Sequence, residues 1–332
     1  MVLVTGASGL LGSRLVFELL QQGYKVRGMG RSAQLPASFR RNCFKDKEHL
    51  LENLEWFQGD ITQRSSVLDA LEDVRQVFHC AGLVSFIPKD RQLVKEINVQ
   101  GTAHIVDGCL VKGIDALCHV SSVAALGRSL QGKYDEDSVW NPDDPHSQYA
   151  ISKYEAEREV WRGVAEGLNA VIVNPGIIIG PGNWKTDSSA LFSKVYEGLR
   201  FYTDGVNGFV ALDDVVKVMT RLVEKEIYGQ RFVLVGENMH YKEVMDLIAD
   251  GLGVKRPSTR AGRFLSGLAW RMESVTSKLT GKRPLITRET AQSAQSVSHY
   301  SNKKALTVMP DGFTDPRIAI QETASKFLQQ MS

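Results

Sequence analysis

Short apolar segments alternate with helical patterns along the first part of the chain. Five such segments, each four to six residues long, occupy positions 2–5, 24–29, 54–58, 77–80 and 116–120. Between the first two, apolar residues recur at helical spacing, at Leu10, Leu11, Leu15, Val16, Leu19 and Leu20. Strands that alternate with helices are typical of a parallel sheet with crossover helices. The pattern therefore predicts a doubly wound α/β fold.

The same alternation continues beyond residue 122. A long helical stretch covers 90–112, a helical pattern over 147–166 precedes an apolar strand at 170–173, and another over 214–226 precedes one at 232–235. We therefore predict a Rossmann domain formed by residues 1–176 and 212–236. A smaller, partly discontinuous C-terminal substrate domain is predicted for residues 177–211 and 237–332.

The segment 255–304 is strongly basic, because it holds eleven Lys and Arg against two acids. An apolar stripe at helical spacing runs through it, formed by Phe264, Leu265, Leu268, Ala269 and Met272. The favoured interpretation is a helix that packs on the body and exposes a basic face to solvent. A wall or lid for an anionic or amphipathic substrate stays open, and so does a peripheral membrane contact.

Composition and charge exclude several classes of protein. The 332 residues include 40 Lys and Arg against 38 Asp and Glu, so the net charge of +2 does not indicate a nucleic-acid partner. The four cysteines lack CxxC or CxxH spacing, so we expect no disulfide framework, no metal site and a reducing, cytoplasmic location. No apolar run reaches the roughly 18 residues of a membrane span. We therefore expect no integral membrane segment, and no secretory signal because the chain opens on a strand.

A glycine-rich turn follows the first predicted strand, where residues 2–12 read VLVTGASGLLG. In such a strand–turn–helix unit, Gly6 permits the tight turn, Gly9 lets a pyrophosphate approach the backbone, and Gly12 lets the helix pack on the sheet. The turn predicts a dinucleotide site with contacts from Gly6, Ser8, Gly9, Leu10, Leu11 and Gly12.

The end of the second strand indicates which nicotinamide dinucleotide binds. A carboxylate there would bind the ribose hydroxyls of NAD and repel a 2′-phosphate. This chain instead has Arg27 and Arg31 and no acid between them. Guanidinium groups make charge-assisted hydrogen bonds to phosphate, so Arg31 favours NADP(H), while NAD(H) stays open. After the third strand, Asp60 and Ile61 are placed to contact the adenine, although an ordinary loop aspartate fits the sequence nearly as well.

Tyr149 and Lys153 open the helical pattern at 147–166, so their side chains lie one turn apart on one face. A phenol with a pKa near 10 is a poor base at neutral pH, but a neighbouring ammonium favours the phenolate. Ser122 stands 27 residues earlier, at the C-terminal end of the fifth strand, where ligands of open α/β sheets bind. The three residues predict a site where Tyr149 exchanges a proton with a substrate hydroxyl or carbonyl oxygen.

Together with HCAG at 79–82 and NVQGT at 98–102, these motifs occur in the order found in one enzyme family. The chain resembles the extended short-chain dehydrogenase/reductase superfamily, the NAD-dependent epimerase/dehydratase grouping. The resemblance implies a Rossmann domain with a smaller substrate domain. It implies that Tyr149 is the general acid/base, that Lys153 holds the nicotinamide ribose, and that Ser122 hydrogen-bonds the reacting oxygen, with Ser121 as its weaker competitor.

The resemblance also assigns other cofactor contacts. Ala81 and Gly82 would line the adenosine ribose and pyrophosphate, and Asn98 would shape its helix. Pro175, Ile177 and Ile178 would pack beside the nicotinamide carboxamide, although a plain strand-to-loop turn also fits. Family members are often dimers through two helices, one of which carries the Tyr149 motif, so a homodimer stays open. His79, His119 and His146 are interpreted as structural.

Three functions share this site. Segments 280–289 and 300–305, TGKRPLITRE and YSNKKA, resemble the dihydroflavonol-reductase-like and 3β-hydroxysteroid-dehydrogenase-like branch, which implies hydride transfer between nicotinamide and a ketone or secondary alcohol. Ser122 has no adjacent acid, which also favours this interpretation over a dehydratase. A nucleotide-sugar epimerase or dehydratase with tightly held NAD and a non-catalytic NADP-sensing protein are the alternatives. Trp184 and Tyr202, in the insertion 182–209, are the predicted substrate contacts.

Overall fold

The computed structural model describes residues 1–36, 39, 44, 47–127, 133–262 and 287–331. Its central sheet has seven parallel strands in the order β11-β7-β5-β4-β1-β2-β3. In chain order these are β1 (Val2–Thr5), β2 (Val26–Gly30), β3 (Leu54–Gln58), β4 (Gln76–His79), β5 (Ala116–Val120), β7 (Ala170–Pro175) and β11 (Gln230–Leu234). The predicted doubly wound parallel sheet is confirmed.

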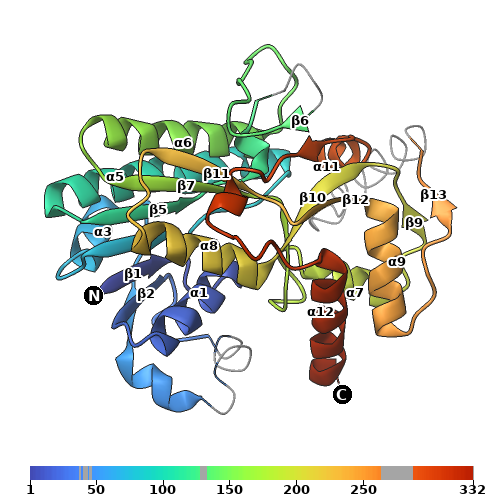
Figure 1. Cartoon of the computed structure of the whole chain (residues 1–332), viewed down its shortest axis with the longest axis horizontal. Helices are drawn as coiled ribbons and strands as arrows, with labels where there is room; N and C mark the ends of the chain where they lie inside the picture. The colour runs from blue at the N-terminus through green and yellow to red at the C-terminus, as the bar shows by residue number, and fades with distance from the viewer. Residues whose placement is uncertain (37–38, 40–43, 45–46, 128–132, 263–286, 332) are drawn as a thin grey trace.

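Helices cover both faces of this sheet (Figure 1). On one face α1 (Leu10–Gln21) packs against α8 (Leu212–Glu224), and on the other α5 (Gly101–Lys112) packs against both α3 (Arg64–Ala70) and α6 (Gln148–Ala165). Successive strand residues point to opposite faces, so Leu3 and Val4, both fully buried, belong to different hydrophobic clusters. This two-sided burial is why inner strands such as β1 and β7 are almost continuously apolar.

The helix expected over 90–112 is interrupted. The chain forms α4 (Arg91–Lys95), a π-helical turn η3 (Glu96–Gln100) and then α5. Short 3-10 helices elsewhere are η1 (Glu48–Asn53), η2 (Pro88–Asp90), η4 (Val123–Ala125) and η5 (Ala305–Thr307). π-helical turns are frequent at functional sites, and this one carries Asn98 of the NVQGT motif.

A second group of elements lies beside the C-terminal end of the central sheet (Figure 1). A three-stranded sheet, ordered β12-β10-β8, joins β8 (Ile177–Ile179), β10 (Val206–Ala211) and β12 (Glu237–His240). Helices α7 (Ala190–Tyr196), α9 (Tyr241–Leu252) and α12 (Pro316–Met331) share a separate hydrophobic cluster with it. The domain boundaries at 176, 211 and 236 stay a prediction.

The C-terminal segment contributes short paired strands. β13 (Thr259–Arg260) pairs with β9 (Phe201–Tyr202), β14 (His299–Tyr300) pairs with β6 (Lys133–Tyr134), and α11 is Arg288–Ser293. The apolar stripe from Phe264 to Met272 lies outside the described residues. Two of the described basic residues form ion pairs, Arg256 with Asp250 at 2.6 Å and Arg260 with Asp204 at 2.5 Å. Within the described ranges no helix is long and apolar enough to cross a membrane.

Candidate active site

The glycine turn joins β1 to α1 in the geometry that a phosphate-binding loop requires. Gly6 has a φ of +63°, and a Cβ there would lie 2.7 Å from the backbone of Ala81. A Cβ at Gly12 would lie 2.2 Å from the carbonyl oxygen of Gly6. Gly9 is the N-cap of α1 and provides no side-chain cap, so backbone N–H groups of the first turn are left for a ligand. The turn therefore fits a dinucleotide pyrophosphate.

The other residues predicted around this turn differ in exposure. Ser8 and Gly9 are exposed, Leu10 is half-buried, and Leu11 lies in the core, so only its backbone can face a ligand. The Ala81 N–H donates to the hydroxyl of Thr5 at 3.2 Å, which fixes the segment after β4 beside the turn. Gly82 is exposed.

The two arginines at the second strand have different roles. Arg27 is buried and makes two hydrogen bonds to the carboxylate of Glu55, at 2.8 and 3.1 Å, so it is a structural residue. Arg31 is exposed, directly after β2. The indole N–H of Trp56 donates to the Ser32 carbonyl at 3.0 Å and the amide of Gln58 to the Arg31 carbonyl at 3.3 Å, so β3 orders the backbone that carries Arg31.

Asp60 and Ile61 follow β3, as expected. One carboxylate oxygen of Asp60 accepts hydrogen bonds from both the N–H and the hydroxyl of Thr62, each at 2.9 Å, which closes a local turn. Ile61 is buried, and its carbonyl contacts Nδ1 of His104 at 3.0 Å. The structure thus gives Asp60 a turn-forming role, and its contact with adenine stays a prediction.

Ser122 and Tyr149 meet at the C-terminal end of β5. The Ser122 hydroxyl is hydrogen-bonded to the Tyr149 phenol oxygen, and it accepts a hydrogen bond from the Ala124 N–H at 3.2 Å. Burial raises the pKa of Tyr149, and the hydrogen bond from Ser122 opposes that rise. The sequence argument expected the phenolate to be favoured by Lys153. Burial has the larger effect, so Tyr149 is a neutral phenol, the form that donates a proton.

Lys153 is buried one turn after Tyr149 on α6. Its ammonium donates to the carbonyl of Val120 at 2.7 Å. Burial lowers the pKa of Lys153 to about 8, while the charge of Glu157 opposes this shift. A Cβ at Gly82 would lie 3.8 Å from the Lys153 Nζ, so the ammonium lies beside the segment that follows β4. The structure therefore brings Ser122, Tyr149, Lys153 and Gly82 to one place.

An apolar wall that the sequence analysis did not single out borders Tyr149. The ring of Phe86 packs edge-on against the Tyr149 ring, with centroids 5.6 Å apart. Val84, two residues earlier in the same loop, is 62% exposed. The signal for this wall is present in the sequence, because an apolar segment, LVSFI at 83–87, directly follows the HCAG motif. Such residues in a loop, and not in a strand, indicate a ligand-facing surface.

The π-helical turn anchors this loop. The side chain of Asn98 accepts from the Leu83 N–H at 2.7 Å and donates to the Leu83 carbonyl at 3.0 Å. It also donates to the hydroxyl of Ser152 at 2.9 Å, which links the loop to α6. The shaping role expected for Asn98 agrees with these contacts. Ser121 is buried, and its hydroxyl has no hydrogen-bond partner among the described residues.

The histidines are structural, as interpreted from the sequence. His79 is fully buried between the hydroxyls of Thr5, at 2.7 Å from Nδ1, and Thr102, at 3.0 Å from Nε2. Burial lowers its pKa to about 3, so it is neutral at physiological pH. His119 lies beside it with ring centroids 5.2 Å apart, and His146 stacks on Trp140 at 3.7 Å.

Of the residues predicted to line the nicotinamide and the substrate, Pro175 lies in the central sheet and the others follow it in the chain. Pro175 ends β7, and Ile177 and Ile178 form β8, so this segment is a strand and not a loop. The indole N–H of Trp184 donates to the side chain of Gln330 at 2.7 Å, which ties it to α12. Tyr202 lies under the Lys242 ammonium, 5.1 Å from its ring centroid. Substrate contacts of Trp184 and Tyr202 stay predictions.

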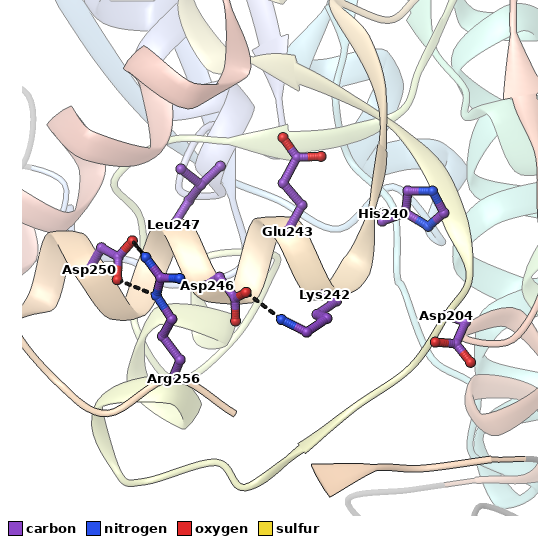
Figure 2. A pocket seen from close by; sticks show the side chains of 8 residues that line it. All are labelled: Asp204, His240, Lys242, Glu243, Asp246, Leu247, Asp250 and Arg256. Atoms are coloured by element: carbon purple, nitrogen blue, oxygen red, sulfur yellow. Dashed lines mark hydrogen bonds and ion pairs between the residues drawn. The ribbon is translucent and has the colours of Figure 1, made fainter. Parts of the chain in front are cut away.

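A surface pocket of about 460 Å³ lies over α9 and includes Lys242, the partner of Tyr202 (Figure 2). Its lining is mostly charged and consists of Asp204, His240, Lys242, Glu243, Asp246, Leu247, Asp250 and Arg256. The carboxylates are ion-paired, for example Asp246 with Lys242 at 2.5 Å and Glu243 with Arg317 at 2.6 Å. None of the triad Ser122, Tyr149 and Lys153 lines this pocket, so it is separate from the candidate active site.

Comparison with known proteins gives a family. The NAD dependent epimerase/dehydratase family matches residues 2–236. Sterol demethylase protein B of Methylococcus capsulatus is 31% identical over 272 residues, which cover 80% of this chain and 79% of that protein. A putative dihydroflavonol 4-reductase of Synechocystis is 28% identical over 91% of this chain and 87% of that protein.

Solved structures share the fold over the whole chain. The crystal structure of gox2253 superposes with a TM-score of 0.81 at 26% identity, covering 99% of this chain and 98% of that one. MoeE5 in complex with UDP-glucose and NAD has a TM-score of 0.75 at 22% identity, covering 100% and 99%. The second likeness shows the fold alone. With the family match over residues 2–236, the chain belongs to the NAD-dependent epimerase/dehydratase family, within the extended short-chain dehydrogenases/reductases.

Proposed function

We propose that this protein is an NADP(H)-dependent reductase that transfers a hydride between nicotinamide and a ketone or secondary alcohol. The observation that carries the proposal is the pair formed by Ser122 and Tyr149, with the Lys153 ammonium one turn away and an apolar wall beside the phenol. A buried hydroxyl pair at the C-terminal end of a parallel sheet suits proton transfer to a carbonyl oxygen.

The cofactor assignment rests on the glycine turn and on Arg31. The first turn of α1 offers uncapped N–H groups to the pyrophosphate, and Gly6 and Gly12 leave no room for side chains. Arg31 is exposed at the end of β2, where the adenosine ribose lies in Rossmann folds, and would pair with a 2′-phosphate. Bound there, NADP(H) supplies the hydride.

The protein's own residues orient the carbonyl and supply the proton. Tyr149, kept neutral by burial, donates its phenol proton to the carbonyl oxygen in the reductive direction. Ser122 has one hydroxyl proton, which would bind the carbonyl oxygen while Tyr149 gives up its proton and would then stabilise the Tyr149 phenolate left behind. Lys153, fixed by the Val120 carbonyl, binds the ribose hydroxyls and places a positive charge near the phenolate. The reverse direction oxidises a secondary alcohol.

The substrate class follows from the apolar wall. Phe86 offers a hydrophobic surface beside Tyr149, and Val84 in the same loop is 62% exposed, which suits a carbonyl compound with an aromatic or alicyclic body. Among the similar proteins, the dihydroflavonol 4-reductase, a cinnamoyl-CoA reductase and an anthocyanidin reductase carry names of this kind. A nucleotide-sugar epimerase remains the alternative.

We also propose that two copies pair through α4 and α6. These helices pack on each other, and Leu93 on α4 is 41% exposed beside that contact. Light scattering coupled to size-exclusion chromatography tests the dimer, and a monomer mass would exclude it.

Cys80, Cys109 and Cys118 are free thiols, which suits the reducing cytoplasm expected from the sequence.

The test of the reductase proposal is Tyr149→Phe, which removes only the phenol oxygen. We expect the rate of NADPH oxidation with aromatic and alicyclic ketones to fall about 10²–10⁴-fold, because general acid catalysis contributes that much. The dissociation constant of NADPH, measured by fluorescence, should change less than about threefold.

Tyr154→Phe is the matched control, because Tyr154 lies on the same helix and stacks on Trp140, 4.3 Å away. We expect it to keep wild-type turnover. Carbonyl turnover that survives Tyr149→Phe contradicts the assigned role. Purified protein that retains NAD through dialysis and turns over no carbonyl supports the epimerase. Tight NADPH binding without turnover supports a sensor.

A further inference from the structure

A buried carboxylate lies behind the candidate catalytic residues. Glu157 follows Lys153 by one turn on α6 and is 1% exposed. Its carboxylate accepts a hydrogen bond from the side-chain amide of Asn174 on β7, at 2.5 Å. The same amide group also donates to the backbone carbonyl of Ser122, at 3.0 Å. Glu157 is thus connected through one side chain to the backbone of the serine that meets Tyr149.

The other carboxylate oxygen of Glu157 faces a cation that anchors a loop. Arg231 on β11 lies 3.3 Å from it and donates to the Glu136 carbonyl, at 2.8 and 2.6 Å, and to the Ser138 carbonyl, at 3.1 Å. The Val233 N–H in turn donates to the Glu136 carboxylate at 2.7 Å. Since Arg231 is already satisfied by backbone carbonyls, a charge on Glu157 is not required to hold this loop.

The groups around Lys153 explain what the negative charge of Glu157 does. The groups that interact with the ammonium are Glu157 on its own helix, Cys80 and His79 around the end of β4, and His119 on β5. Both histidines are neutral because burial lowers their pKa values, and burial raises the pKa of the Cys80 thiol, so it is protonated. Glu157 is therefore the anion among these groups, and it opposes the effect of burial on Lys153.

We propose that Glu157 is a positioning residue of the active site: it holds the Ser122 carbonyl through Asn174 and places a buried carboxylate one helical turn from Lys153. This rests on the proposed function in one respect, that Lys153 binds the ribose of the nucleotide. The role concerns the protonation and placement of groups that Glu157 does not touch directly, so it is distinct from catalysis by Glu157 itself.

The test is Glu157→Gln, which keeps an oxygen for the Asn174 amide and removes the charge. The readout is the dissociation constant of NADPH between pH 6.5 and 9.5, measured by fluorescence. In the wild type, the affinity for NADPH should weaken above the Lys153 pKa of about 8, which gives the plot of affinity against pH a falling alkaline limb. In the variant this limb should move down by roughly one pH unit, so that NADPH binds about fivefold more weakly at pH 8 and equally at pH 6.5.

Arg231→Gln is the matched control, because it disturbs the same cluster and leaves the anion in place. Its limb should stay at the wild-type pH or move up. Identical limbs in wild type and Glu157→Gln overturn the proposal, as does a limb that moves down in Arg231→Gln. Equal weakening at every pH also overturns it, since only structural damage gives that result. A wild type that binds NADPH but reduces no carbonyl contradicts the reductase proposal alone.

Discussion

Single residues decide the chemistry of this site by their surroundings more than by their type. Tyr149 and Lys153 both lie in places that disfavour charge, and the Lys153 pKa falls to about 8. The spacing predicted that Tyr149 and Lys153 lie one turn apart, as they do on α6, but the expected direction of the Tyr149 pKa was wrong, because burial cannot be read from a spacing of four residues. The hydrogen bond from Ser122, found only in three dimensions, lowers the pKa of Tyr149 and so opposes the effect of burial.

The proposed preference for NADP(H) rests on a single residue, Arg31, which is exposed directly after β2. Arg31→Asp replaces a cation by the acid that would bind ribose hydroxyls and repel a 2′-phosphate. We expect NADPH to bind at least roughly tenfold more weakly, because hydrogen bonds to a charged group contribute about 1.5–3 kcal/mol, and NADH to bind as well or better. Thermal unfolding with each nucleotide measures this, since a ligand of the native state raises the midpoint.

Arg31→Gln separates the two parts of that effect, because it removes the cation without adding an acid. This variant should weaken the binding of NADPH and leave the binding of NADH unchanged. If NADPH stabilises Arg31→Asp as strongly as the wild type, Arg31 does not bind the phosphate, and the preference for NADP(H) has no support at this position.

At the scale of elements, the contacts of α8 show what holds the C-terminal segment to the Rossmann sheet. Asp214, in the first turn of α8 and 1% exposed, accepts from both the N–H of Thr314, at 2.6 Å, and its hydroxyl, at 3.1 Å. Thr314 lies two residues before α12 begins. The Asp214 side chain thus fixes the approach to α12, whose core contacts include Phe327.

Asp214→Ala removes both hydrogen bonds and leaves a partly buried N–H without its partner. We expect the free energy of unfolding in urea to fall by about 2–3 kcal/mol. Asp213→Ala is the control on the neighbouring position. Asp213 is 56% exposed and pairs with Arg14 at 2.6 Å, so its loss should cost less than about 1 kcal/mol. Equal losses in the two variants would show that the Thr314 contact does not stabilise the fold.

Elements were predictable where local pattern and burial agree. The inner strands of the central sheet, such as β1, β5 and β7, are apolar and buried, and all seven strands lie near their predicted places. The sheet of β8, β10 and β12 was missed, because its strands have three to six residues and pair only through contacts distant in sequence, such as Phe209 with Ile177. The π-helical turn was also missed, since its pattern is helical on either side.

For the whole molecule, the family and the fold followed from motifs, and the site only in part. The glycine turn, Ser122, Tyr149 and Lys153 could be located because their spacing and their positions at strand ends are fixed by the fold. Phe86 and Glu157 were missed. Phe86 lies in a loop without periodicity, and Glu157 looks like a surface acid on a helix until Asn174 and Arg231 arrive from strands β7 and β11.

The central claim is that a nicotinamide dinucleotide and a carbonyl compound meet at the hydroxyls of Ser122 and Tyr149. The most direct measurement is a single turnover with NADPH deuterated at C4 of the nicotinamide and an aromatic or alicyclic ketone, followed by mass spectrometry of the alcohol. We predict one deuterium on the carbinol carbon with the wild type and none with Tyr149→Phe in the same time. NADPH that binds while the ketone is recovered without deuterium and unreduced would contradict the account.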